Sequence, residues 1–104
     1  MEESREAFDR LRLIRSENIG PVTYRQLIIR FGSAARALAA IPELAARGGG
    51  RSPRIADASQ IESELQTIRG LGARLLFLGD SAYPSLLAEL GNAPPVLLWS
   101  GRLE

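Results

Sequence analysis

The sequence contains no cysteine and no histidine. Without cysteine, neither a disulfide framework nor a thiolate metal site can form. The lack of histidine removes the usual general base and the commonest metal ligand. No apolar run approaches the ~20 residues that a membrane span needs, and the acidic start MEES is unlike a signal peptide. These absences favour a cytoplasmic module that is not an enzyme, spans no membrane and holds no cofactor or metal.

Lysine is also absent, so all 13 cationic side chains are arginines, and they are unevenly spread. From Arg15 to Arg54, seven arginines stand against two acids, a net charge of +5, whereas the rest of the chain has six arginines and ten acids, a net charge of −4. This asymmetry suggests an anionic partner for the first half. Arginines that simply coat exposed helix faces would give the same pattern.

Apolar residues recur at helical spacing through the first half of the chain. The spacing predicts helices over residues 4–17, 22–31 and 33–41. Gly32 is the expected left-handed end of the second helix, and Ser33 the expected cap of the third. Pro42 is expected to open a short fourth helix, PELAAR.

The stretch GGGRSP, residues 48–53, predicts a boundary between a helical domain at residues 1–54 and a second unit at residues 55–104. The second unit has a helix–strand–helix–strand pattern. Ser59 begins the capping-box spacing S-x-x-E, and the apolar run at 75–78 is typical of a strand buried on both faces. Two strands and two helices do not make a stable α/β sheet, so we expect the start of a larger domain.

The stretch ENIGPVTYRQLIIRFG, residues 17–32, predicts a tight turn followed by a helix. A Gly-apolar-Gly turn between two helices lets backbone N–H groups bind a phosphate at the positive end of the second helix dipole. In the triplet Asn18-Ile19-Gly20, asparagine replaces the first glycine and tolerates a positive φ, and Ile19 is expected to point into the core. The residues predicted to contact a nucleic-acid backbone are Asn18, Gly20, Val22, Thr23, Arg25 and Arg30. A Gly-Pro corner between packed helices is the alternative interpretation.

Three aromatic residues are candidates for base stacking. Tyr24 is expected on the exposed side of the second helix, whereas Tyr83 and Trp99 are expected to pack. No G-x-G-x-x-G sequence occurs, and no two carboxylates are predicted to meet over a cleft, so a catalytic or nucleotide-binding site is the least favoured interpretation.

Two motifs in fixed order, LRLIRSENIGPVTYRQLIIRFGSAARAL at residues 11–38 and GDSAYPSLLAELGNAPPVLLWSG at residues 79–101, resemble the N-terminal part of the DNA-processing protein family DprA, also called Smf. The resemblance implies a mainly α region: a small SAM-like or helix-hairpin-helix-like bundle, followed by the first α/β elements of an incomplete Rossmann-like domain. It also implies a dimeric, non-catalytic protein that binds single-stranded DNA, protects it during natural transformation and loads RecA onto it. The main DNA-binding, dimerisation and RecA surfaces of the family would lie beyond this chain.

The leading hypothesis is therefore an accessory N-terminal region of a single-stranded-DNA-binding recombination mediator. The alternative is a protein-interaction module with no DNA affinity of its own, whose arginines meet acidic side chains. Steep salt dependence of DNA binding would distinguish the first from the second, because phosphate neutralisation releases counterions.

Overall fold

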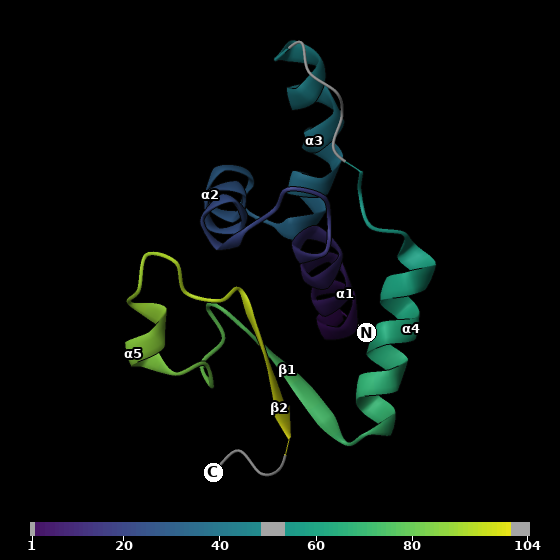
Figure 1. The fold of residues 1–104 in the computed structure, drawn as a ribbon, viewed down its shortest axis with the longest axis vertical. Helices are drawn as coiled ribbons and strands as arrows, with labels where there is room; N and C mark the ends of the chain where they lie inside the picture. The colour runs from purple at the N-terminus through teal and green to yellow at the C-terminus, as the bar shows by residue number, and fades with distance from the viewer. Residues whose placement is uncertain (1, 49–53, 101–104) are drawn as a thin grey trace.

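The computed structural model describes residues 2–48 and 54–100. In chain order, its elements are α1 (Glu2–Ile14), α2 (Pro21–Phe31), α3 (Ala34–Arg47), α4 (Ala58–Gly70), β1 (Ala73–Phe77), α5 (Ser85–Ala88) and β2 (Val96–Ser100). Figure 1 shows α1 in the middle of the molecule, with α2 and α3 towards one end, α4 alongside and the two strands towards the other end. The predicted mainly helical class is confirmed.

The helix α1 separates two apolar clusters. In the first cluster, Leu13 of α1 packs with Tyr24 of α2 and Ile41 of α3. In the second, Leu11 of α1 packs with Ile61 of α4 and Phe77 of β1. Leu11 and Leu13 are both fully buried, two positions apart on one helix, so α1 buries two faces. The helix thereby joins the predicted helical domain to the elements that follow it.

Local signals fix the end of α2 and the start of α3 as predicted, whereas α2 begins one residue before its predicted start and α1 ends at Ile14, three residues before its predicted end. Pro21 occupies the first turn of α2, where its missing N–H costs nothing. Gly32 ends α2 in the left-handed conformation at φ 83°, and its N–H donates to the Ile28 carbonyl. The Ser33 hydroxyl then accepts from the Arg36 amide and caps α3.

Two helix predictions are wrong. The helix α3 runs without interruption through Pro42, so no separate fourth helix begins there. Proline in a helix interior costs about 3 kcal/mol; in α3 the buried side chains of Leu38 and Ile41 hold the preceding turn against the core and offset this cost. The cap of α4 is Asp57, whose carboxylate accepts from the Ser59 amide, and Ser59 already lies within the helix.

The strands β1 and β2 pair antiparallel, with Leu75 opposite Leu98 and Phe77 opposite Val96. Only Leu76 and Phe77 of β1 are buried, and Phe77 belongs to the second apolar cluster. The expectation of burial on both faces along the strand is wrong. That these strands open a Rossmann-like domain stays a prediction, as does the boundary between 1–54 and 55–104. Residues 49–53 of the predicted linker lie outside the described residues. Among those described, no helix has both the length and the apolar character required to cross a membrane.

Candidate nucleic-acid interface

The predicted turn joins α1 to α2 and contains the left-handed residue that the sequence predicts. Asn18 lies at φ 64°, and it is the one described residue other than glycine with a positive φ. Ile19 packs against the first apolar cluster, as its place in the triplet predicts. Gly20 follows in an extended conformation and makes no side-chain cap, so the amides at the start of α2 are left uncovered.

The first two amides of α2 are unused. The Tyr24 N–H is the first in the helix to be bonded, to the Gly20 carbonyl at 2.9 Å. The N–H groups of Val22 and Thr23 have no acceptor within the described part of the chain. Both residues are exposed, and the first turn of α2 contains no acid. Unpaired N–H groups at the positive end of a helix dipole attract an anion.

Arg25 lies one helical turn into α2, but its guanidinium already has protein partners. It donates to the carbonyl of Ala88 at 3.1 Å and to that of Leu90 at 3.3 Å. Ala88 is the last residue of α5 and Leu90 lies two positions beyond it, and arginines commonly bond carbonyls at a helix end. These bonds occupy two of the five N–H donors of the guanidinium.

Arg30 lies at the other end of α2. It is nine positions after Pro21, which at ~1.5 Å per residue places it roughly 13 Å along the helix from the turn. Its guanidinium lies over the Phe31 ring, 5.1 Å from the centroid. The structure therefore brings Asn18, Gly20, Val22 and Thr23 together and leaves Arg30 apart from them.

Intramolecular ion pairs neutralise part of the basic excess. Arg15 binds Glu64 through two hydrogen bonds, of 2.8 and 3.3 Å, which with the charge of Glu64 raise the pKa of its guanidinium. Arg47 pairs with Glu43 at 2.8 Å. Arg51 lies outside the described residues.

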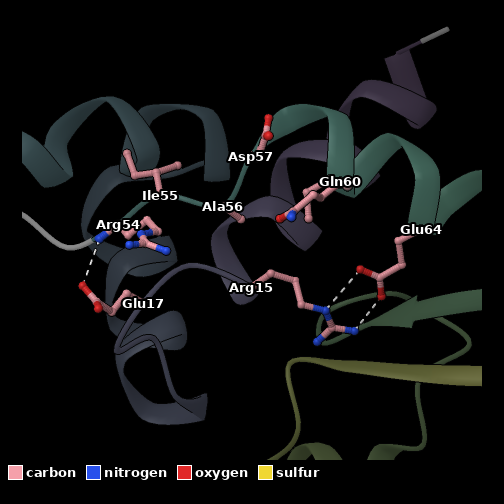
Figure 2. A pocket seen from close by; sticks show the side chains of 9 residues that line it. Arg15, Glu17, Arg54, Ile55, Ala56, Asp57, Gln60 and Glu64 are labelled. Carbon is pink, nitrogen blue, oxygen red and sulfur yellow. Dashed lines mark hydrogen bonds and ion pairs between the residues drawn. The ribbon is translucent and has the colours of Figure 1, made fainter.

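A polar hollow lies beside the turn, where the end of α1 meets the start of α4 (Figure 2). Its lining residues are Arg15, Glu17, Arg54, Ile55, Ala56, Asp57, Gln60, Ile61 and Glu64. Figure 2 shows Arg15 directed at Glu64, and Glu17 at the Arg54 backbone. Three acids and two arginines line the hollow, so its charge does not favour a phosphate.

The segment 54–56 is hydrogen-bonded to the end of α1, in an arrangement that sequence reasoning missed. The Ser16 hydroxyl donates to the Arg12 carbonyl at 2.8 Å and accepts from the Ala56 amide at 3.1 Å. The Arg12 guanidinium donates to the Ala56 carbonyl at 2.8 Å. Glu17 and Arg54 exchange two further bonds, of 2.9 and 3.0 Å. We call these contacts the Ser16 clasp; because it holds residues 16 and 17, it fixes where the turn begins.

The prediction that Tyr24 is exposed is wrong. Only 3% of its surface is accessible, because it faces α1 and α3, and this burial raises the pKa of its phenol to about 12. Tyr83 packs as predicted, and its hydroxyl donates to the Pro94 carbonyl at 2.7 Å. Trp99 is 38% exposed on β2, so the expectation that it packs is wrong. No aromatic ring is therefore available beside the turn in the described residues.

Within residues 2–48 and 54–100, no group of three His, Cys, Asp or Glu side chains is placed to hold a metal ion. None of the curated proteins compared with the sequence matches it. The family model described as "DprA-like N-terminal HHH domain" matches residues 4–67. This match covers α1 to α3 and most of α4, and it includes the whole turn between α1 and α2. Because it extends over more than half of the sequence, the chain belongs to the DprA family, of which it carries the N-terminal HHH domain.

Proposed function

We propose that this region is the accessory N-terminal part of a cytoplasmic single-stranded-DNA-binding recombination mediator, and that its Asn18–Thr23 turn contacts DNA phosphates. The observation that carries the proposal is the pair of unused amides, Val22 and Thr23, at the start of α2. Membership of the DprA family supports a DNA-related role. Protection of incoming strands, RecA loading, a homodimer and the absence of catalysis are proposed for the whole protein on the family resemblance.

The charges around the turn are compatible with a phosphate. The acid nearest in sequence, Glu17, directs its Oε1 to the Arg54 amide at 3.0 Å. Thr23 adds a hydroxyl, and Arg25, four positions after Pro21, adds a cation one helical turn into α2. Such a site contacts ~2 phosphates, and each contact with a single strand contributes a slope of about −0.7 to the dependence of log K on log salt. Binding by this region alone should be weak and salt-sensitive.

The test is fluorescence anisotropy of labelled oligo-dT with the 104-residue chain at low and moderate salt, repeated with Thr23→Glu. A carboxylate in the first turn stabilises a helix by about 0.3–1 kcal/mol, so this variant should fold at least as well as the parent. It should nevertheless bind at least about fivefold more weakly, because a negative charge about 4 Å from the phosphate repels it by about 1 kcal/mol even in water. Gln66→Glu is the matched control, since it adds the same charge at an exposed position of α4.

Equal binding by Thr23→Glu and Gln66→Glu would refute the phosphate site at the turn. If no oligo-dT bound even at low salt, the turn would be a corner between packed helices.

Replacing Arg25 with glutamate tests whether the contact reads sequence. Phosphate contacts carry no base information, so the loss of affinity should be similar for oligo-dT, oligo-dC and mixed sequences. Arg69→Glu, which reverses an exposed charge on α4, is the control. A changed order of preference among the three oligonucleotides would mean that base contacts are involved.

A protein-interaction module is the second candidate. Val22 and Ile29 are 50% and 76% exposed, and their spacing of seven residues places them on one face of α2. An exposed apolar pair of this kind favours a protein partner. DNA affinity that is absent, or that does not change with salt, would favour this function over the first.

A further inference from the structure

The helix α5 is weakly held against the rest of the molecule. It is a single turn, and no other described helix or strand packs extensively on it. Leu86 is 80% exposed, Leu90 is 51% exposed, and no residue of α5 is fully buried. Among the described residues, the only side-chain hydrogen bonds between residues 85–90 and helices α1–α4 are the two that Arg25 donates, to the carbonyls of Ala88 and Leu90. Segments with few buried contacts open at low free-energy cost.

Arg25 also belongs to the face of α2 that leads to the turn. It lies three positions after Val22 and four after Pro21, which are its neighbours on the helix surface. Side chains on a helix lean towards its N-terminus, so the guanidinium covers surface on the side of the unused amides. A phosphate bound there would lie within the region that the Arg25 side chain can sample.

The two acceptors differ in strength. Backbone carbonyls are neutral, whereas a phosphate is charged and accepts two parallel N–H bonds from a guanidinium. A phosphate at the amides of Val22 and Thr23 would therefore draw the guanidinium away from the carbonyls of α5.

We propose that α5 is a displaceable segment that regulates the phosphate-binding turn: DNA takes over the Arg25 guanidinium and releases α5, and docked α5 lowers the affinity of the turn for DNA. This inference rests on the proposed function of the turn. Thermodynamic linkage makes the effect reciprocal. If bound DNA lowers the equilibrium constant for α5 docking by some factor, docked α5 lowers the equilibrium constant for DNA binding by the same factor.

The distance between α2 and α5 reports the release directly. The chain has no cysteine, so Ile29→Cys and Leu86→Cys provide two unique and exposed labelling sites, one on each helix. Spin labels at these positions allow the separation to be measured by double electron–electron resonance in the 104-residue chain. We expect one narrow distance distribution without DNA, and a longer and broader one with saturating oligo-dT at low salt. Adding Arg25→Gln should broaden the distribution without any DNA.

The effect of α5 docking on DNA affinity is tested with the same two cysteines. A bis-maleimide whose length matches the measured separation should hold α5 in the docked position. Oligo-dT should then bind about fivefold more weakly than to the same protein capped with a monofunctional maleimide, a factor at the lower end of typical allosteric couplings. Arg25→Gln should make the cross-link lose this effect, because the shared group is gone.

The outcomes separate the coupling from the function on which it rests. One contrary result is that oligo-dT binds without changing the distance between the two spin labels, and another is that it binds equally to the cross-linked and capped proteins. Either result would overturn the coupling and leave the phosphate site intact. Failure of oligo-dT to bind the capped protein at low salt would overturn both. A narrow distribution in Arg25→Gln without DNA would overturn the claim that Arg25 holds α5.

Discussion

The geometry of the Ser16 clasp predicts how much the free energy of unfolding falls when the Ser16 hydroxyl is removed. Ser16 is 6% exposed, and its hydroxyl serves as donor to the Arg12 carbonyl and acceptor from the Ala56 amide. Ser16→Ala removes both bonds and fills the site with a methyl group. The Ala56 N–H then loses its acceptor in a part-buried position, and leaving one such group unsatisfied costs about 1–3 kcal/mol.

We expect Ser16→Ala to lower the free energy of unfolding by about 2 kcal/mol. For a domain of this size, each kcal/mol corresponds to roughly 4–8 °C in Tm, so the melting temperature should fall by roughly 8–16 °C. Urea and thermal unfolding followed by circular dichroism measure both quantities. Amide hydrogen exchange at Ala56 gives a local readout, since this N–H should lose protection before the core of α1 does.

Ser59→Ala is the matched control, because Ser59 is exposed and its backbone amide, bonded to Asp57, is unaffected. Its effect should stay within about 0.5 kcal/mol. If Ser16→Ala and Ser59→Ala were equally stable, or if Ala56 exchanged at the same rate in both, the reasoning that the hydroxyl joins segment 54–56 to α1 would be refuted.

The other two predictions concern the turn and the buried tyrosine. Asn18→Ala should lower the free energy of unfolding by about 1 kcal/mol, because alanine is strained at φ 64°, whereas Asn18→Gly should be nearly neutral; equal urea midpoints for the two variants would contradict the left-handed turn. Tyr24 stays neutral in the folded state up to a pKa of about 12, whereas the unfolded chain releases this proton from about pH 10. The contribution of Tyr24 to stability should therefore be complete below pH 10 and fall by up to about 2 kcal/mol as pH rises towards 12, with urea midpoints measured at several pH values. Tyr24→Phe should remove that part of the pH dependence, and an unchanged profile would contradict the assignment.

The conformations at the helix ends and in the turn could be predicted from the sequence. Gly32 and Ser33 mark the end of one helix and the start of the next because their conformations depend on their own backbone and neighbouring amides. The left-handed Asn18 follows from the same reasoning, since asparagine tolerates a positive φ. The triplet also placed Ile19 against the core correctly.

Contacts between segments far apart in the chain could not be predicted from the sequence. The Ser16 hydroxyl meets the Ala56 amide 40 positions away, and Arg25 meets the Ala88 carbonyl 63 positions away. Neither backbone group has a signature in the sequence, because every residue carries a carbonyl and nearly every one an amide. The same limit applies to Tyr24, whose phenol is compatible with either an exposed or a buried face.

The sequence by itself determined where α2 ends, where α3 begins and that Asn18 is left-handed, because caps and left-handed positions are decided within a few residues. Tertiary structure alone decided that α3 continues through Pro42, that β1 and β2 pair antiparallel, and that Arg25 binds α5. Each of these outcomes depends on surface buried, or on acceptors supplied, by segments far away in the chain. Such free energies outweigh local propensities that amount to a few kcal/mol at most.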